Sequence, residues 1–221
     1  MKKLLFVILL LSNLIAFSQD KEKQYKKYFK NGNLKELGYK SKNGEKTGIF
    51  KYYHENGQIL VTGQFENEKE TGKWLYFYND GKPNMTGNFE NGKQSGEWKK
   101  YYNNGKLMQL EYYKNGYLND EWKFYHENGE LFNIGKYTDG NKIGEWKTYH
   151  DNGKLSSISY FENGEQTGAA KTYYDNGQLW GLGNFANNHQ IGEWKIYDES
   201  GKLIKSELFD KDGKLIKTKE Y

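Results

Sequence analysis

The chain lacks cysteine and arginine altogether, and its 221 residues include a single proline. The absence of cysteine excludes disulfides, thiolate metal sites, a cysteine nucleophile and a lipidated N-terminal cysteine. The absence of arginine removes the guanidinium fork that recognises phosphate groups through two parallel hydrogen bonds. Apolar residues show no helical periodicity, whereas glycine is abundant at 26 residues, so the composition is typical of a β protein.

The excess of positive charge is also small. The 33 basic residues are all lysine and stand against 29 acidic residues, which gives a formal net charge of +4. Proteins that bind nucleic acids or anionic membranes generally carry a large net or clustered basic charge. We therefore expect no nucleic-acid partner, and no membrane association beyond an N-terminal signal peptide.

What the chain does contain is a set of large aromatic residues that recur with a period of 24 residues. Phe, Trp and Tyr make up 17% of the sequence although only 35% is hydrophobic, so these rings supply much of the surface that folding can bury. One position of the repeat, the tryptophan column, holds Trp74, Trp98, Trp122, Trp146 and Trp194, with Phe50 and Ala170 in the two remaining units. A fixed period over seven units indicates a tandem-repeat architecture.

Two turn signals occur in most units. Asn-Gly or Asp-Gly recurs at positions equivalent to Asn104-Gly105 and again at positions equivalent to Asn91-Gly92. Both dipeptides are preferred at the centre of type I′ hairpin turns, where both residues have positive φ. Two turns per unit leave strands of about eight to ten residues, and no segment is long enough for a crossover helix. The sequence therefore predicts an all-β fold, an elongated, twisted antiparallel meander of tandem 24-residue β-hairpin repeats.

The turns also predict the register, and hence the two faces of the sheet. With two-residue loops at both turns, Trp98 faces Glu111 in one neighbouring strand and Met85 in the other. This register places the tryptophan column on one face with a leucine column (at Leu107), a Phe/Tyr column (at Phe89) and glycine columns. One of the glycine columns consists of Gly63, Gly87, Gly135 and Gly183. Such glycines leave room for an indole to lie across the strand.

The opposite face is expected to carry a tyrosine column (at Tyr101), a lysine column (at Lys99) and a column that varies from unit to unit. The variable column consists of Leu60, Asn84, Met108, Phe132, Ser156, Trp180 and Ile204. The aromatic residues Tyr112, Phe132 and Trp180 are predicted to share this face. Because exposed apolar patches often mark interfaces, these three residues are the candidate partner-binding residues.

The two ends of the chain differ from the repeats. A lysine pair, a short apolar run and Ala16-Phe17-Ser18 are typical of a secretory signal peptide, and the run is shorter than the ~20 residues of a membrane span. Lysines near the C-terminus are typical of a protected sheet edge. We assign residues 1–18 to a signal peptide cleaved after Ser18, 19–24 to a flexible segment, 25–210 to the repeat array and 211–221 to a capping strand. The expected location is periplasmic or secreted.

The blocks Gly-x-Trp-x-x-Tyr, Asn-Gly-x-Leu and Gly-x-Phe resemble the MORN repeat, in particular its bacterial variant, over about residues 25–210. The resemblance implies a row of β-hairpins that forms an elongated, twisted strip. Proteins similar to this one are often described as antitoxin-like components of toxin–antitoxin systems, and eukaryotic relatives are linked to membrane or scaffold roles. The resemblance implies no catalytic motif.

Two further columns carry chemically active side chains. His54, His126 and His150 share one column, but residues one unit apart lie two strands apart, or ~9.6 Å, too far for Zn–N bonds of ~2.0–2.1 Å. We interpret these histidines as replacements for tyrosine near a turn. A glutamate column consists of Glu97, Glu121, Glu145 and Glu193. Cross-strand charge pairing with lysine explains it better than the two unlike carboxyl groups of a glycosidase.

No Ser/His/Asp set, phosphate-binding glycine loop or metal-ligand cluster is visible, so we expect no enzyme activity, catalytic residue, cofactor or metal. The sequence predicts an exported, non-enzymatic repeat protein that acts as a protein-binding or scaffolding module. Two alternatives stay open: an antitoxin-like or immunity protein that neutralises a toxin, and a glycan-binding surface module. The expected partner is a protein, with a polysaccharide as the alternative.

Overall fold

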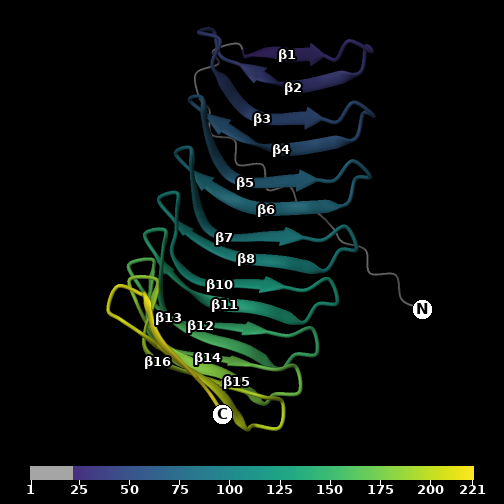
Figure 1. Ribbon diagram of the computed structural model, residues 1–221. Helices are drawn as coiled ribbons and strands as arrows, with labels where there is room; N and C mark the ends of the chain where they lie inside the picture. Colours follow the sequence, from purple (N-terminus) through teal and green to yellow (C-terminus); the bar gives the residue numbers. More distant parts are fainter. Residues whose placement is uncertain (1–21) are drawn as a thin grey trace, which may run out of the picture.

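The computed structural model describes residues 22–221. All helices and strands assigned within this range are β-strands, so the described part of the chain has no helix. Eighteen strands form one sheet, and successive strands pair antiparallel along the chain. Only the two-residue strand β9 departs from this order, since β8 pairs with both β9 and β10. The sheet is an elongated, twisted strip with β1 at one end and the last strands at the other (Figure 1). The predicted fold is confirmed.

In chain order the strands are β1 (Lys23–Tyr28), β2 (Leu34–Lys40), β3 (Lys46–Tyr53), β4 (Ile59–Glu66), β5 (Lys69–Phe77), β6 (Pro83–Glu90), β7 (Lys93–Tyr101), β8 (Leu107–Lys114), β9 (Tyr117–Leu118), β10 (Asp120–Tyr125), β11 (Leu131–Thr138), β12 (Asn141–Tyr149), β13 (Leu155–Glu162), β14 (Glu165–Tyr173), β15 (Leu179–Ala186), β16 (His189–Tyr197), β17 (Leu203–Phe209) and β18 (Leu215–Glu220). The predicted signal peptide at residues 1–18 lies outside the described residues. The part of the chain that is described has no helix long and apolar enough to cross a membrane. At the C-terminal end, β18 pairs with β17 and all of its residues are exposed.

The two turns of each unit are of different kinds. At the second turn Asn91 and Gly92 both have positive φ, 50° and 78°, as a type I′ turn requires. At the first turn the loop has three residues: the Tyr102 N–H donates to the Lys106 carbonyl at 2.9 Å. Only the last of them, Gly105, has positive φ, at 83°. This is the three-residue loop in which a type I turn precedes a left-handed glycine, so the predicted type I′ geometry is wrong here.

The extra loop residue changes which side chains share a face. Tyr101 lies opposite Leu107, with a β-bulge beside the pair. Because directly opposed residues project to the same side of a sheet, the leucine column lies with the tyrosine column. The prediction that it lies with the tryptophan column is wrong. We call the side that carries the tryptophan column the tryptophan face, and the side that carries the tyrosine column the tyrosine face.

The register of Trp98 agrees with prediction on one side only. Trp98 lies opposite Glu111, as the first turn predicted. Across the second turn Met85 pairs with Lys100 rather than with Trp98, because the ladder shifts between Thr86 and Asn88. Within this irregular stretch Gly96 has a φ of 65°, which favours glycine. The bulge lets the indole lie back over the preceding strand.

The core lies on the tryptophan face. Within residues 22–221 the buried hydrophobic side chains are Phe50, Phe65, Trp74, Trp98, Trp146, Ala170 and Trp194. The indole of Trp98 lies flat on Gly87, where an added Cβ would be 2.0 Å from Cδ2 of the ring. Gly63, Gly135 and Gly183 lie in the same way beneath Trp74, Trp146 and Trp194. A thin sheet thus buries large rings without a second layer, because glycine removes the side chain that would hold each ring away.

Hydrogen bonds at the first turns join each unit to the next. The Asn104 side chain accepts the Lys106 N–H at 2.9 Å and donates to the Glu127 carbonyl of the next unit at 3.2 Å. The same donation to the following unit recurs from Asn56, Asn128 and Asn152. One residue type therefore shapes the turn and ties neighbouring hairpins together, which explains its recurrence at this position.

Candidate binding surface

The three candidate aromatic residues do not share a face. Phe132 packs against Phe124 and His126, with ring centroids 5.9 Å and 4.8 Å apart. Phe124 in turn stacks on Trp122 at 6.0 Å, which places Phe132 on the tryptophan face. Trp180 lines the same hollow as Trp194 and is also on that face.

Tyr112 lies on the tyrosine face instead. It is opposite Glu97 and donates its hydroxyl to a carboxylate oxygen of that residue at 3.2 Å. The prediction of one shared face is therefore wrong. The cause is the bulge after the first turn: Phe132 is the extra residue between Leu131, which pairs with Tyr125, and Asn133. Strict alternation fails at a bulge, which re-aims the side chain.

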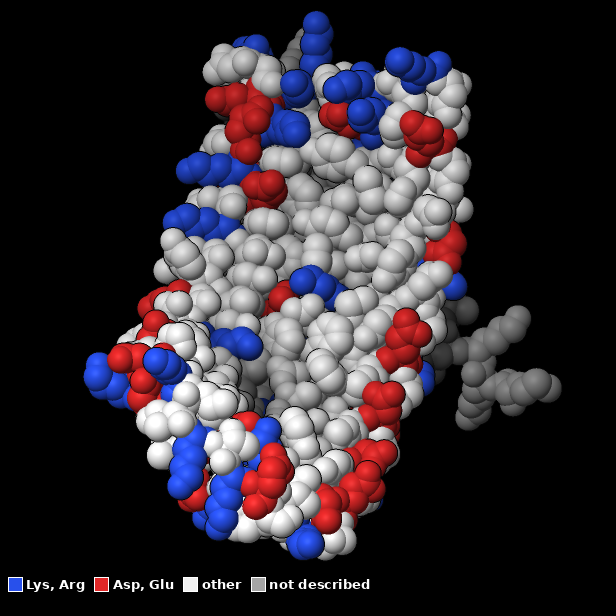
Figure 2. All heavy atoms as spheres, in the orientation of Figure 1, with Lys and Arg blue, Asp and Glu red and all other residues white. Residues whose placement is uncertain are grey.

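The tryptophan face is hollowed and carries little charge. Figure 2 shows one side of the strip, in which a hollowed centre of mostly uncharged side chains is bordered by Lys, Asp and Glu at the margins and ends. The glutamate and lysine columns, at Glu97 and Lys99, alternate with Trp98 and so project from the tyrosine face. The weakly charged side is therefore the tryptophan face. Its exposed rings include Phe132 at 37% and Trp180 at 48%.

The tyrosine face carries ion pairs along its strands. Glu97 Oε1 lies 2.6 Å from Lys99 Nζ, and Glu145 Oε1 lies 2.7 Å from Lys147 Nζ. Each pair joins residues of one strand, so the prediction of cross-strand pairing is wrong. The hydrogen bond from Lys99 holds the pKa of Glu97 below its usual value, and the same bond raises the pKa of Lys99. Both groups are thus fixed in their charged forms.

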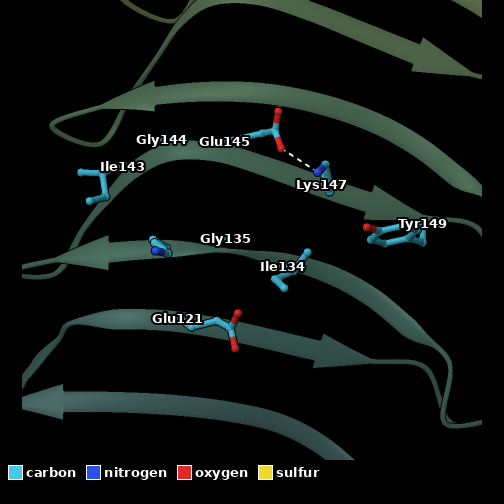
Figure 3. Close-up of a pocket in the computed structure, with 9 residues that line it drawn as sticks. Glu121, Ile134, Gly135, Ile143, Gly144, Glu145, Lys147 and Tyr149 are labelled. Atoms are coloured by element: carbon cyan, nitrogen blue, oxygen red, sulfur yellow. Dashed lines mark ion pairs between the residues drawn. The ribbon is translucent and has the colours of Figure 1, made fainter.

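An open depression of about 440 Å³ lies among these pairs. Figure 3 shows that its lining includes Glu121 of β10 and Glu145 of β12, with Lys147 paired to the latter. Glu121 is paired in the same way with Lys123, which also lies in β10. Two carboxylates in equivalent environments do not offer the unlike acid and base that hydrolysis of a glycoside needs.

The histidine column makes structural hydrogen bonds. His150 Nε2 lies 2.9 Å from the Tyr173 carbonyl oxygen of the next unit. Tyrosine at the same column makes the equivalent bond, from the Tyr102 hydroxyl to the Tyr125 carbonyl at 2.6 Å. Among residues 22–221 no group of three or more His, Cys, Asp or Glu side chains could hold a metal ion. His54 and His150 thus act as tyrosine does, whereas His126 Nδ1 lies 3.0 Å from a carboxylate oxygen of Asp151.

Two units depart from the pattern of a ring over a glycine, and neither departure was among the sites predicted from the sequence. In one, Glu111 takes the glycine position; its side chain is buried and lies 3.4 Å from the Lys100 ammonium. Burial and the nearby Glu111 raise the pKa of Tyr113 to about 12. The signal in the sequence is the glutamate itself, standing in a column of glycines.

In the other unit Ala170 takes the tryptophan position and Ser159 takes the glycine position. A hollow of about 430 Å³ lies there, and Trp180, Phe185 and Trp194 contribute to its walls. Both substitutions can be read in the sequence. That they leave a hollow follows only once it is known which residue lies beneath each indole, and the bulge determines that residue.

The family model described as MORN repeat variant matches the chain at residues 46–67, 70–91, 94–115, 121–139, 142–164, 166–187 and 190–211. Among solved structures, similarity is found to crystal structures of TcdB2-TccC3-Cdc42 and TcdB2-TccC3. Each is 12% identical over 90% of this chain and 14% of that chain, with TM-scores of 0.25 and 0.20. The chain thus spans a small part of these proteins, and such scores support no functional comparison. A comparison with curated proteins gives no significant match.

Proposed function

The chain belongs to the MORN repeat variant family, and from that premise we propose that it is a non-enzymatic module that binds a protein partner along its tryptophan face. The observation that carries the proposal is the exposure of large rings on a weakly charged surface, with Phe132 at 37% and Trp180 at 48% exposed. Aromatic residues of this kind tend to anchor protein interfaces. A tandem array also offers an extended surface in which each unit contacts its neighbours.

The rigidity of the strip supports this proposal. Side chains at the first turns bond to backbone carbonyls of the next unit, as Asn152 does to Asp175 at 2.8 Å. Tyr174 makes a second link of this kind to the Tyr197 carbonyl at 2.9 Å. A surface held in this way loses little conformational entropy on binding, which favours affinity.

The proposal assigns no catalytic group, cofactor or metal. The glutamates that could serve as acids or bases are held by lysines, as Glu145 is by Lys147 at 2.7 Å. His54 and His150 are held by backbone carbonyls, His54 by that of Phe77 at 3.2 Å, and His126 Nδ1 lies 3.0 Å from a carboxylate oxygen of Asp151. These side chains have structural roles that account for their positions.

We also propose that the protein acts outside the cytoplasm, in the periplasm or as a secreted protein, because residues 1–18 have the pattern of a signal peptide. The partner is then a protein of the cell envelope or its surroundings, and a toxin neutralised there would be one such partner. Mass spectrometry of the native protein decides the location: a mature N-terminus at Gln19 is expected, and intact Met1 in a soluble cytoplasmic fraction would contradict it.

The central experiment is capture of partners from the organism's own envelope fraction, followed by measurement of direct binding to the purified partner. Replacing Phe132 and Trp180 by Ser should abolish both. Tyr112→Ser is the matched control, since it removes a ring from the tyrosine face and should leave binding intact. Thermal unfolding of each variant shows that the fold persists. Unchanged binding by a folded double variant would place the partner elsewhere.

A further inference from the structure

We propose that the hollow around Ala170 is a binding slot for one aromatic side chain of the protein partner, a tryptophan-like ring with a hydrogen-bond donor at its edge. The inference rests on the proposed function, because it names what the partner inserts into the tryptophan face. It goes further in assigning the ligand chemistry to one unit. The other units of the same chain show what fills this position when a ring is present.

The first argument is an interruption in a ladder of rings. Along the tryptophan face the indoles of Trp74, Trp98 and Trp146 each sit between two aromatic neighbours. Trp146 contacts Tyr137 at 5.1 Å and Phe161 at 6.0 Å, both edge to face. The next indole position holds Ala170, so no ring lies between Phe161 and Phe185. An aromatic guest at this position would restore edge-to-face contacts of the kind worth ~0.5–1.5 kcal/mol each.

The second argument is the space. The hollow of about 430 Å³ is lined by four residues that are smaller than their counterparts in another unit: Ser157, Ala170, Thr172 and Gly181. At the same positions another unit has Met85, Trp98, Lys100 and Gln109. The hollow is therefore lined by several small residues and is not only the space left by a missing indole.

The third argument is a hydrogen-bond acceptor at a repeated place. The Trp98 indole N–H donates to the Asn88 carbonyl at 3.2 Å, and the Trp194 indole N–H donates to the Asn184 carbonyl at 3.2 Å. In both cases the acceptor lies ten residues before the tryptophan. The equivalent carbonyl for Ala170 is that of Tyr160. A guest ring with an N–H at its edge thus meets the counterpart of the acceptor that Trp98 and Trp194 use, although the indole N–H groups of Trp74 and Trp146 have no such partner.

The lining of the hollow contains no cationic side chain that would bind an anionic guest. Among the residues that line the hollow, Glu207 is the one charged side chain, and it is paired with Lys205 at 2.6 Å. The remaining polar groups are amides and hydroxyls, such as Gln166, which donates to the Ser159 hydroxyl at 3.0 Å. An uncharged ring with one polar edge matches this set. The exposed indole of Trp180 at the rim would cover the backbone that carries such a ring.

The test uses N-acetyl-tryptophanamide as the probe and the purified full protein as the receptor, followed by NMR. We expect the probe to shift the indole N–H signals of Trp180 and Trp194 and to leave that of Trp74, in a distant unit, unchanged. The filled variant Ser159→Gly with Ala170→Trp should lose these shifts, because its own indole takes the slot, and should unfold at a higher temperature. Ala170→Phe, which copies Phe50 of the first unit, is the second filled variant if the indole does not fit.

The outcomes separate this inference from the proposed function. Probe binding that persists in a folded filled variant, no probe binding at all, or the same shifts produced more strongly by a neutral oligosaccharide would each overturn the slot. If the probe binds and is lost on filling, yet the purified partner binds the filled variant normally, the ring of the partner lies elsewhere. The tryptophan-face proposal then still stands or falls on the Phe132 and Trp180 variants.

Discussion

The indole of Trp98 rests directly on the α-carbon of Gly87, so closely that a Cβ there would lie 2.0 Å from the ring. The same contact between an indole and a glycine recurs at the other buried indoles, so it contributes to stability along the whole strip. It explains how a single sheet excludes water without a second layer: the indole lies flat over the strand instead of projecting away from it.

We predict that Gly87→Ala destabilises the protein by about 1–3 kcal/mol or more, the usual cost of overpacking a core. The added methyl must displace the Trp98 ring, which is 1% exposed. Urea unfolding followed by tryptophan fluorescence measures the effect. In a Trp98→Ala background the same substitution should cost much less, because the methyl then enters space that the indole has left. Equal costs in the two backgrounds would contradict the contact.

The tryptophans should not be equivalent. Trp98→Ala is expected to cost about 3–5 kcal/mol, as large-to-small changes in a core do. Trp122→Ala should cost clearly less, since Glu111 occupies the glycine position beneath Trp122 and the indole is only half-buried. Because repeats couple mainly to their neighbours, hydrogen exchange in Trp98→Ala should rise first in β6 to β8. Uniform exchange along the chain, or equal costs for the two variants, would argue against this description.

The period of the columns was sufficient to predict the antiparallel meander, but not the faces of the sheet. Asn-Gly fits a type I′ turn and also a type I turn followed by a left-handed glycine. At Asn104-Gly105 the second choice pairs Leu107 with Tyr101 instead of Tyr102, and the bulge beside that pair then restores the predicted register. Bulges then re-aim single side chains such as Phe132. The slot at Ala170 could be noticed as a missing tryptophan, whereas its walls depend on that bulged register.

Alkaline pH should destabilise the fold through Tyr76. Burial, with a smaller effect of Glu70, raises the pKa of Tyr76 to about 12 from its ordinary value of 10.0. Between these two pH values the folded protein keeps the proton that the unfolded chain has lost, so this group's contribution to stability is complete below pH 10 and is lost as pH rises towards 12. Tyr76→Phe should therefore show a shallower loss of unfolding free energy over this range. Identical slopes for the variant and the wild type would sink the assignment.

Histidine and tyrosine should be interchangeable in the side-chain hydrogen bonds that join one unit to the next. His150 Nε2 lies 2.9 Å from the Tyr173 carbonyl, where Tyr102 places a hydroxyl 2.6 Å from the Tyr125 carbonyl in another unit. His150→Tyr should therefore retain the wild-type stability, while His150→Phe, which keeps a ring but has no donor, should lose about 0.5–1.5 kcal/mol, the net value of a typical hydrogen bond.

Chemical unfolding of the two variants measures the difference, and Tyr102→Phe is the matched control because it removes the same kind of bond from another unit. The losses in His150→Phe and Tyr102→Phe should add when the two changes are combined, since the bonds lie in units that share no partner. A His150→Tyr protein as unstable as His150→Phe would show that histidine is required at this position for a reason other than the carbonyl it contacts. The column would then mark a site rather than a link between hairpins.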